Sequence, residues 1–242
     1  MTQIPWLNPS NTIFPAPDLA LSEPNGLLAV GGDLSPDRIL AAYKSGIFPW
    51  FNPGDPILWW SPSPRTVIYP SRLHLSKSLR KIIRAGTYRV TFDNCFNDVM
   101  RACSEPRRDS DGTWISEDII AGYTALHRRG FAHSVEVWRG QELVGGLYGM
   151  ALGKIFFGES MFSRSDNASK VGFAHLVQQL IAWDFKLIDC QVANDHLFSL
   201  GAVEIPREEF QQLLLNFVHK IPNYPANWST LSNSEIGVER LL

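Results

Sequence analysis

The sequence predicts an α+β protein in which a small N-terminal domain precedes a larger domain built on a mixed sheet. The first stretch, to about residue 64, is rich in Pro, Gly and Trp, which is typical of short elements joined by tight turns. From residue 76 onward, helical and strand patterns alternate regularly. Because the run Ser-Pro-Ser-Pro at 61–64 separates the two regions, we expect a small α/β domain at 1–64 and a second domain at 65–242.

Three helices are marked by the residues at their ends or by the pattern of their side chains. The first lies between Ser35, which can cap it, and Gly46, which can end it. The second, at 76–86, has an apolar face and, opposite it, a basic stripe. This basic stripe consists of Lys77, Arg80, Lys81 and Arg84. The third, at 116–129, has acidic residues in its first turn and arginines in its last, as the helix dipole favours.

The remaining pattern predicts strands around one long helix. Residues 133–162 suit an antiparallel meander of three strands with turns at 139–140 and 152–153. A long amphipathic helix opens at 165–167, and residues 187–192 then suit a strand followed by a short helix. The order β-β-β-α-β-α is that of an N-acetyltransferase-like (GNAT- or Fem-like) domain, a fold that by itself does not determine function.

Composition limits the classes of function. The 22 Lys and Arg against 24 Asp and Glu give a formal net charge of -2, so any contact with RNA must come from a local patch. No stretch approaches the roughly 20 apolar residues that a membrane helix requires, and the N-terminus does not have the pattern of a signal peptide. We therefore expect a soluble cytoplasmic protein whose three cysteines are reduced thiols.

Several common mechanisms lack their sequence signatures. Dinucleotide, phosphate-loop and HExxH motifs are absent and the six histidines are scattered, so we expect no cofactor and no metal. Ser160 lacks the glycine two residues later that a nucleophilic serine elbow requires, and Cys190 lies inside an apolar strand, which favours a core thiol. The long helix opens without the Gly-rich turn that holds coenzyme A, which disfavours a coenzyme A-dependent N-acyltransferase.

Seven short strings in one order carry a resemblance to a known family. They are EPNGLL at 23–28, GGDLS at 31–35, GIFPWF at 46–51, WWSP at 59–62, GESMFS at 158–163, NASK at 167–170 and IDCQV at 188–192. With them the chain resembles the bacterial leucyl/phenylalanyl-tRNA-protein transferases from about residue 14 to residue 206. The resemblance implies transfer of Leu or Phe, and less well Met, from aminoacyl-tRNA to proteins beginning with Arg or Lys, which creates a degradation signal.

Asp189 and Gln191 are the candidate catalytic pair. They stand two apart on a predicted strand and so project from one face, with Ile188 and Cys190 on the other. The resemblance implies that Asp189 orients Gln191, whose carbonyl oxygen accepts a proton from the attacking amine. A neutral amide is a very weak base, so Asp189 or a water is an alternative proton acceptor, and a purely structural pair is the alternative to catalysis.

Glu159 is the candidate for binding the acceptor peptide. It lies between apolar residues on a predicted strand, where an unpaired carboxylate is costly, so a cation should pair with it. The resemblance implies the acceptor's Arg or Lys, and an internal salt bridge, for example with Arg164, is the alternative.

The resemblance also assigns residues to the aminoacyl-tRNA, each with an ordinary structural role as its alternative. The apolar pocket for the amino acid comprises Leu147, Phe156 and Leu176. Aromatic residues around the terminal adenosine and this pocket are Trp50, Trp114 and Tyr123. The basic stripe is the candidate for tRNA phosphates, because such contacts supply affinity without base identity. A tRNA-binding module without catalysis, and a transferase that builds cell-wall peptides from aminoacyl-tRNA, are further functions that the residues leave open.

Overall fold

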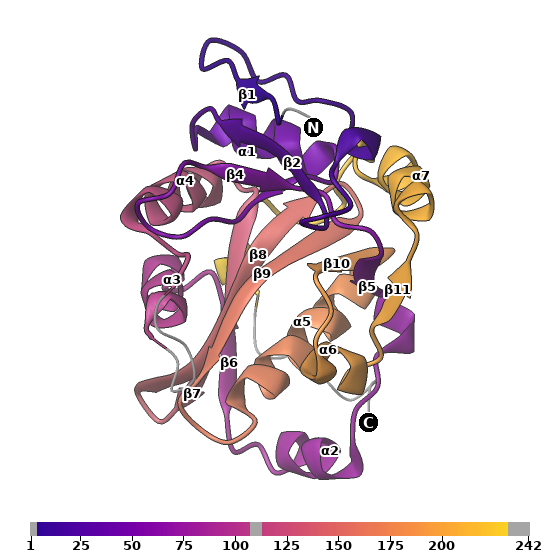
Figure 1. Ribbon diagram of the computed structural model, residues 1–242. Helices are drawn as coiled ribbons and strands as arrows, with labels where there is room; N and C mark the ends of the chain where they lie inside the picture. Colours follow the sequence, from indigo (N-terminus) through magenta and orange to yellow (C-terminus); the bar gives the residue numbers. More distant parts are fainter. Residues whose placement is uncertain (1–3, 107–112, 232–242) are drawn as a thin grey trace.

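The computed structural model describes residues 4–106 and 113–231, which form two sheets of different size (Figure 1). The expected α+β fold is confirmed, with a small N-terminal part and a larger part built on a mixed sheet. The small sheet ends at Trp60 and the large sheet begins at Arg65. The division into domains at residue 64 stays a prediction.

The small sheet has the strand order β1-β2-β4-β3. Its strands are β1 (Trp6–Leu7), β2 (Leu27–Gly31), β3 (Phe48–Pro49) and β4 (Leu58–Trp60), with the short helix η1 (Pro17–Leu19) before β2. Helix α1 (Pro36–Lys44) joins β2 to β3. The predicted cap is present, since the Ser35 side chain accepts the backbone N–H of Arg38, and Gly46, with a φ of +74°, follows the end of the helix.

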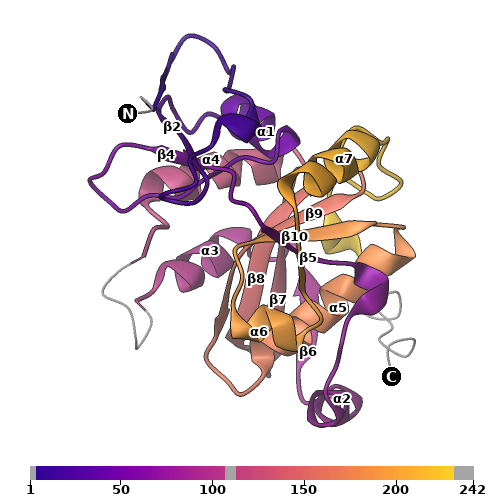
Figure 2. The same cartoon turned by 45° about the vertical axis from the view of Figure 1, so that its right-hand side comes forward.

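The large sheet has the order β11-β5-β10-β9-β8-β7-β6, in which only the β9–β10 pair is parallel. Its strands are β5 (Arg65–Ile68), β6 (Arg89–Phe92), β7 (Ala132–Arg139), β8 (Glu142–Leu152), β9 (Ile155–Ser163), β10 (Leu187–Gln191) and β11 (Val203–Ile205). After β4 the chain passes from the small sheet into the large one as β5, which lies beside β10 in both views (Figure 2). The expected meander is β7 to β9.

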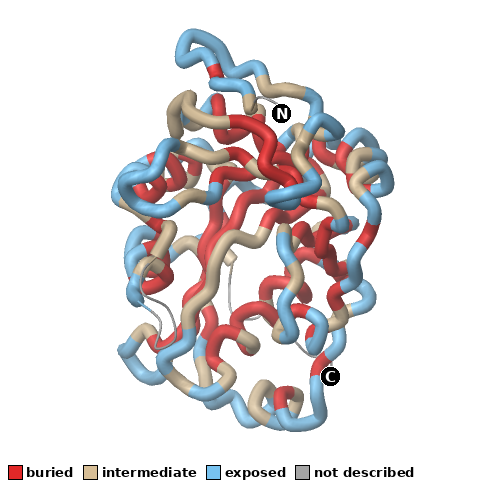
Figure 3. The backbone as a smooth tube through the Cα atoms, viewed as in Figure 1, coloured by how far each residue is buried: buried red, intermediate tan, exposed pale blue. Residues whose placement is uncertain are grey.

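Helices cover both faces of the large sheet and enclose two hydrophobic clusters. On one face lie α1, α3 (Phe96–Ser104), α4 (Glu117–Arg128) and α7 (Arg207–Phe217), and on the other lies α5 (Ala168–Ala182). The other helices are η2 (Pro70–Arg72), α2 (Lys77–Arg84), α6 (Asp195–Ser199) and η3 (Trp228–Thr230). The buried residues follow the central strands and α5, and the exposed ones the outer turns (Figure 3).

Among the described strands and α-helices that follow residue 64, five were not expected from the sequence: β5, β6, α3, β11 and α7. Their strands are three or four residues long, too short to show a period, and they extend the predicted meander on both sides. Within the described ranges, no helix combines the length and apolar character of a membrane-spanning segment.

Candidate active site

A cavity of about 1310 Å³ lies where β9 and β10 separate. The two strands pair only through residues 155–157 and 187–189, and beyond that point each strand contributes a wall. Strand β8 and helices α3, α5 and α6 complete the lining. Small-molecule pockets span about 300–1,000 Å³, so this central cavity can admit a larger ligand.

A bulge in β9 directs Glu159 into the wall of the central cavity. The register passes from Tyr148 opposite Ser160 to Gly149 opposite Gly158, so Glu159 is the extra residue of β9. Gly149 permits this close approach, because a Cβ there would meet the Phe157 carbonyl oxygen at 2.3 Å. The bulge therefore places a carboxylate in the wall of the central cavity.

Glu159 is held by three side chains from three other elements. Its Oε1 accepts the Tyr43 hydroxyl of α1 at 2.6 Å and Nε2 of Gln191 in β10 at 3.0 Å. Its Oε2 accepts the Tyr123 hydroxyl of α4 at 3.1 Å, and the two phenol oxygens are 2.5 Å apart. Burial raises the pKa of Glu159 to about 8, although both phenol hydrogen bonds lower it.

Within the described part of the chain, Glu159 makes no ion pair. The alternative of an internal salt bridge with Arg164 is wrong, because Arg164 pairs with Glu105 near the surface. Glu159 is half-buried, and desolvation of its carboxylate disfavours the charged form, which is the physical cause of its raised pKa. The acceptor-binding role expected for Glu159 stays a prediction.

Asp189 is completely buried and forms a two-point ion pair with Arg65. The Arg65 Nε donates to Oδ1 at 2.8 Å and its Nη2 to Oδ2 at 2.7 Å, while the guanidinium lies between the rings of Phe48 and Phe210. The backbone N–H of Gln191 also donates to Oδ1, at 2.9 Å. Asp189 therefore contacts the backbone of Gln191, and this sealed position argues against direct proton transfer from a substrate.

Gln191 is half-buried and follows a second bulge. The β10–β5 register shifts between Asp189 and Gln191, and Gln191 has a φ of +64°, so strict alternation ends at this residue. Ile188 and Cys190 line the central cavity, away from the buried carboxylate of Asp189. Cys190 is half-buried at the cavity wall and so is not the core thiol expected, but desolvation raises the pKa of its thiol, which disfavours a role as nucleophile.

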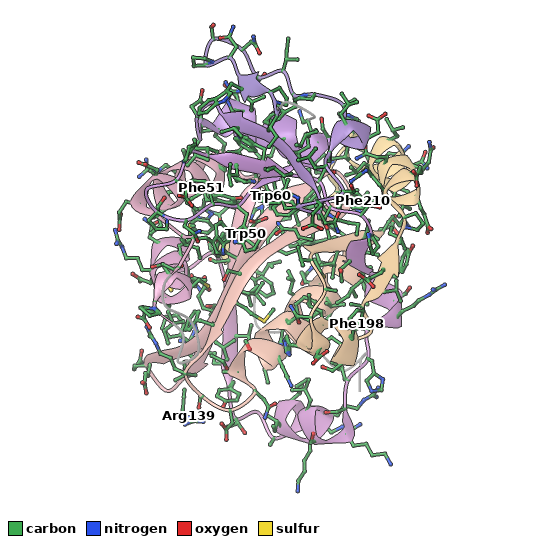
Figure 4. All side chains as sticks on the ribbon, viewed as in Figure 1. Trp50, Phe51, Trp60, Arg139, Phe198 and Phe210 are labelled. Atoms are coloured by element: carbon green, nitrogen blue, oxygen red, sulfur yellow. The ribbon has the colours of Figure 1, made fainter. Side chains whose placement is uncertain are left out.

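The residues expected around the aminoacyl group and adenosine are only partly brought together. Leu147 and Phe156 are buried and line the central cavity, and Leu176 is buried in the same hydrophobic cluster. Tyr123 lies in the Glu159 network. Trp50 is exposed and lies beside Trp60, with ring centroids 5.8 Å apart and planes tilted by 60° (Figure 4). Trp114 is half-buried against the other cluster. Neither Trp50 nor Trp114 is among the described residues that line the cavity.

The basic stripe lies on α2, at the end of the molecule remote from the small sheet (Figure 1). Lys77, Lys81 and Arg84 are exposed, while Arg80 is half-buried and donates from Nε to the Leu75 carbonyl oxygen at 3.2 Å. The stripe is thus available at the surface, but its role stays a prediction.

The start of α5, where a coenzyme A phosphate would bind in an acetyltransferase, is already occupied by internal hydrogen bonds. The N–H of Ala168 donates to the Ser165 carbonyl oxygen at 3.0 Å and that of Ser169 to Ser163 Oγ at 3.2 Å. Two backbone amides that could bind an anion therefore already have partners. Together with the missing glycine turn, this disfavours a coenzyme A phosphate at the start of α5.

The sequence did not predict the ion pair of Arg65 with Asp189 or the hydrogen bond of Tyr43 to Glu159. Arg65 opens a short strand and carries no local signal of its partner, whereas Tyr43 belonged to an apolar helix stripe. A tyrosine in such a stripe needs a partner for its hydroxyl when it is buried, and this need was the one available signal.

Two family models match the chain. One described as leucyl/phenylalanyl-tRNA protein transferase matches residues 67–215, and one described as the N-terminal domain of that transferase matches residues 32–63. Two solved structures align with the chain. The first is 15% identical with a TM-score of 0.36, and the alignment covers 77% of this chain and 60% of that structure. The second is 12% identical with a TM-score of 0.37, and the alignment covers 78% of this chain and 59% of that structure. They are the C-terminal domain of a putative lysylphosphatidylglycerol synthetase from Agrobacterium fabrum and L-PGS from Bacillus licheniformis.

Several relatives align along most of the chain. The leucyl/phenylalanyl-tRNA–protein transferase of Cellvibrio japonicus is 67% identical over 225 residues, 93% of this chain and 96% of the relative. That of Nitrosospira multiformis is 62% identical over 216 residues, 89% of this chain and 93% of the relative. That of Saccharophagus degradans is 54% identical, covering 92% and 91%. The chain belongs to the leucyl/phenylalanyl-tRNA protein transferase family.

Proposed function

We propose that this protein transfers leucine or phenylalanine, and less well methionine, from aminoacyl-tRNA to the α-amino group of proteins that begin with Arg or Lys, and so marks them for degradation. The observation that carries the proposal is the hydrogen bond from the Gln191 amide to Glu159, because Glu159 lines the central cavity. Because both substrates are cytoplasmic molecules, we place the reaction in the cytoplasm.

The proposed reaction is aminolysis of an ester. The amine nitrogen attacks the carbonyl carbon, a C–N bond forms, the C–O bond to the ribose breaks, and the proton lost by nitrogen ends on the ribose oxygen. An α-amino group has a pKa of roughly 7.7–8.0, so little help is needed to obtain the neutral nucleophile. The enzyme must chiefly hold two large substrates in the reactive orientation, which requires no cofactor.

Gln191 has the geometry of an orienting group. Its backbone is held by Asp189 and its side chain by Glu159, so its amide is fixed in direction. In this proposal the Gln191 carbonyl oxygen accepts a hydrogen bond from the incoming amine. Asp189 is the positioning residue of the pair, because it holds the backbone of Gln191 and does not itself contact the amine. Arg65 neutralises the charge of Asp189.

The remaining groups supply the two substrate-binding regions. Glu159, which makes no ion pair with any described residue, meets the Arg or Lys side chain with which the acceptor begins. Leu147, Phe156 and Leu176 form the apolar region for the transferred side chain. Trp50, Trp114 and Tyr123 serve the adenosine end, for which stacking is worth about 1–3 kcal/mol per base. The basic stripe Lys77, Arg80, Lys81 and Arg84 holds tRNA phosphates.

One assay tests the proposal directly. The purified protein is incubated with labelled Leu-tRNA or Phe-tRNA and an Arg-initiated peptide, without ATP or added metal, and label in the peptide is measured. An otherwise identical Ala-initiated peptide is the matched acceptor control. Absence of label from the Arg-initiated peptide with both tRNAs would refute the proposed function.

The same assay tests Gln191. The substitution Gln191→Ala should lower the turnover rate by far more than it lowers the affinity for tRNA, because the amide orients the amine only when the reaction occurs. The exposed Gln212 provides a matched control, since Gln212→Ala removes an amide on the surface of α7. Unchanged turnover of Gln191→Ala would remove this residue from the mechanism.

A further inference from the structure

Tyr43, Tyr123 and Glu159 form a closed ring of hydrogen bonds. Each of the three groups contacts both others, at 2.6 Å, 3.1 Å and 2.5 Å. With Glu159 protonated, its hydroxyl can donate to Tyr123, Tyr123 to Tyr43, and Tyr43 back to the other carboxyl oxygen. With Glu159 ionised, both phenols can donate to the carboxylate. The ring thus accommodates gain or loss of one proton without movement of its heavy atoms.

The other candidate proton acceptors at this place are weaker. The Gln191 amide is a very weak base, and its Nε2 already donates to Glu159. Asp189 is sealed and both of its oxygens accept hydrogen bonds from Arg65. Glu159 lines the central cavity and is one hydrogen bond from the group that would orient the amine.

We propose that Glu159, held in the ring with Tyr43 and Tyr123, takes the proton from the attacking α-amine and returns it to the departing ribose oxygen. In this step the nitrogen lone pair forms the C–N bond, the pair of the C–O bond leaves with the ribose oxygen, and one proton passes from nitrogen to carboxylate to oxygen. Gln191 orients the amine. This inference rests on the proposed function and assigns the proton transfer to Glu159 instead of Gln191.

The electrostatic surroundings of Glu159 support this role. Burial raises its pKa to about 8, close to the roughly 7.7–8.0 of an α-amine, so proton transfer between the two groups is nearly balanced. The charged and titratable groups that act on Glu159 are Tyr43, Tyr123, Tyr148, Asp189 and Arg65. Asp189 raises the pKa of Glu159, whereas Arg65 and the two ring phenols lower it. Because the ionised form accepts the proton, turnover must rise as pH increases through this pKa.

The test is the pH profile of kcat at saturating aminoacyl-tRNA, with two Arg-initiated acceptors whose α-amino pKa values differ. In the wild-type protein, one ionisation near pH 8 should be independent of the acceptor. In Glu159→Gln that ionisation should vanish and kcat should fall by about 100-fold or more, within the range for general acid–base catalysis. Glu159→Asp, which keeps a carboxylate, should restore part of kcat and so distinguishes lost chemistry from misfolding.

The ring gives a second, independent readout. Because each phenol lowers the pKa of Glu159, Tyr43→Phe and Tyr123→Phe should each move the acceptor-independent ionisation to higher pH. Tyr69→Phe, which removes a surface Tyr–Glu contact with Glu209, is the matched control and should not move it. A raised KM with unchanged kcat in Glu159→Gln, or an unmoved profile in the phenol variants, would overturn the inference. Absence of transfer by the wild-type protein would instead defeat the proposed function.

Discussion

The buried Arg65–Asp189 pair offers a quantitative test of how the site is built. The perturbations are Asp189→Asn, Arg65→Met and the double variant. The Arg65 side chain is 1% exposed and that of Asp189 is 0% exposed, and two hydrogen bonds of 2.8 Å and 2.7 Å join them. Removing one partner leaves an uncompensated charge, which in buried pairs costs about 3–5 kcal/mol. We expect each single variant to lose free energy of unfolding in this range.

The double variant should be less damaged than the sum of the two. With both charges gone, no ion is left without a partner, and the Met side chain introduced by Arg65→Met can still lie between the rings of Phe48 and Phe210. The amide oxygen introduced by Asp189→Asn can still accept the backbone N–H of Gln191. Because replacing a buried pair by neutral residues is often close to neutral, we expect a total cost of about 2 kcal/mol or less.

Urea unfolding, with equal m-values as the check on a two-state transition, measures these free energies. The exposed pair Arg129–Asp37 is the matched control, and breaking it should cost under about 1 kcal/mol. The turnover rate of the folded fraction of Asp189→Asn should stay within about tenfold of the wild-type rate. Loss of a positioning residue should lower the rate by less than the roughly 10²–10⁴-fold that general acid–base catalysis contributes. Single-variant costs below about 1 kcal/mol, or strictly additive costs, would refute the reasoning.

Two further predictions concern the C-terminal segment and the basic stripe. Trp228 is fully buried and stacks on His133 with ring centroids 3.7 Å apart, so Trp228→Ala should lower the free energy of unfolding by about 3–5 kcal/mol, measured in urea. Replacing Lys77 and Lys81 by Gln should make tRNA affinity less dependent on salt. The slope of log affinity against log salt concentration, measured by filter binding, should become shallower by up to about 0.9 for each lost phosphate contact. A loss of only about 1 kcal/mol for Trp228→Ala, or an unchanged salt slope for the stripe, would contradict these expectations.

The elements with strong local signals were predicted well. Helix α1 carries the expected serine cap at Ser35, because capping depends on residues only three positions apart. Helices α2 and α4 begin where the sequence predicted, and the structure shows that Ser76 and Ser116 cap them. The meander and α5 were predicted from their periods. Strands β5 and β11 were not predicted, because they are short and their place is set by pairing with each other and, for β5, with β10.

The candidate site was predicted only in part for a related reason. Family strings named Gln191 and Glu159, and the structure brings their side chains to 3.0 Å. The face of a strand follows from alternation only while the register is regular, and both residues lie at bulges. Alternation alone therefore does not show where either side chain points.

By itself, the sequence determined the fold class, the order of the main elements and the resemblance that named the site residues, because these depend on local spacing and short strings. Only the tertiary structure decided which groups face one another. Tyr43 meets Glu159 across 116 positions and Arg65 meets Asp189 across 124. Contacts at such separations depend on how α1 packs against the large sheet and on which strand pairs with β5. Local preferences of the chain do not determine either of these.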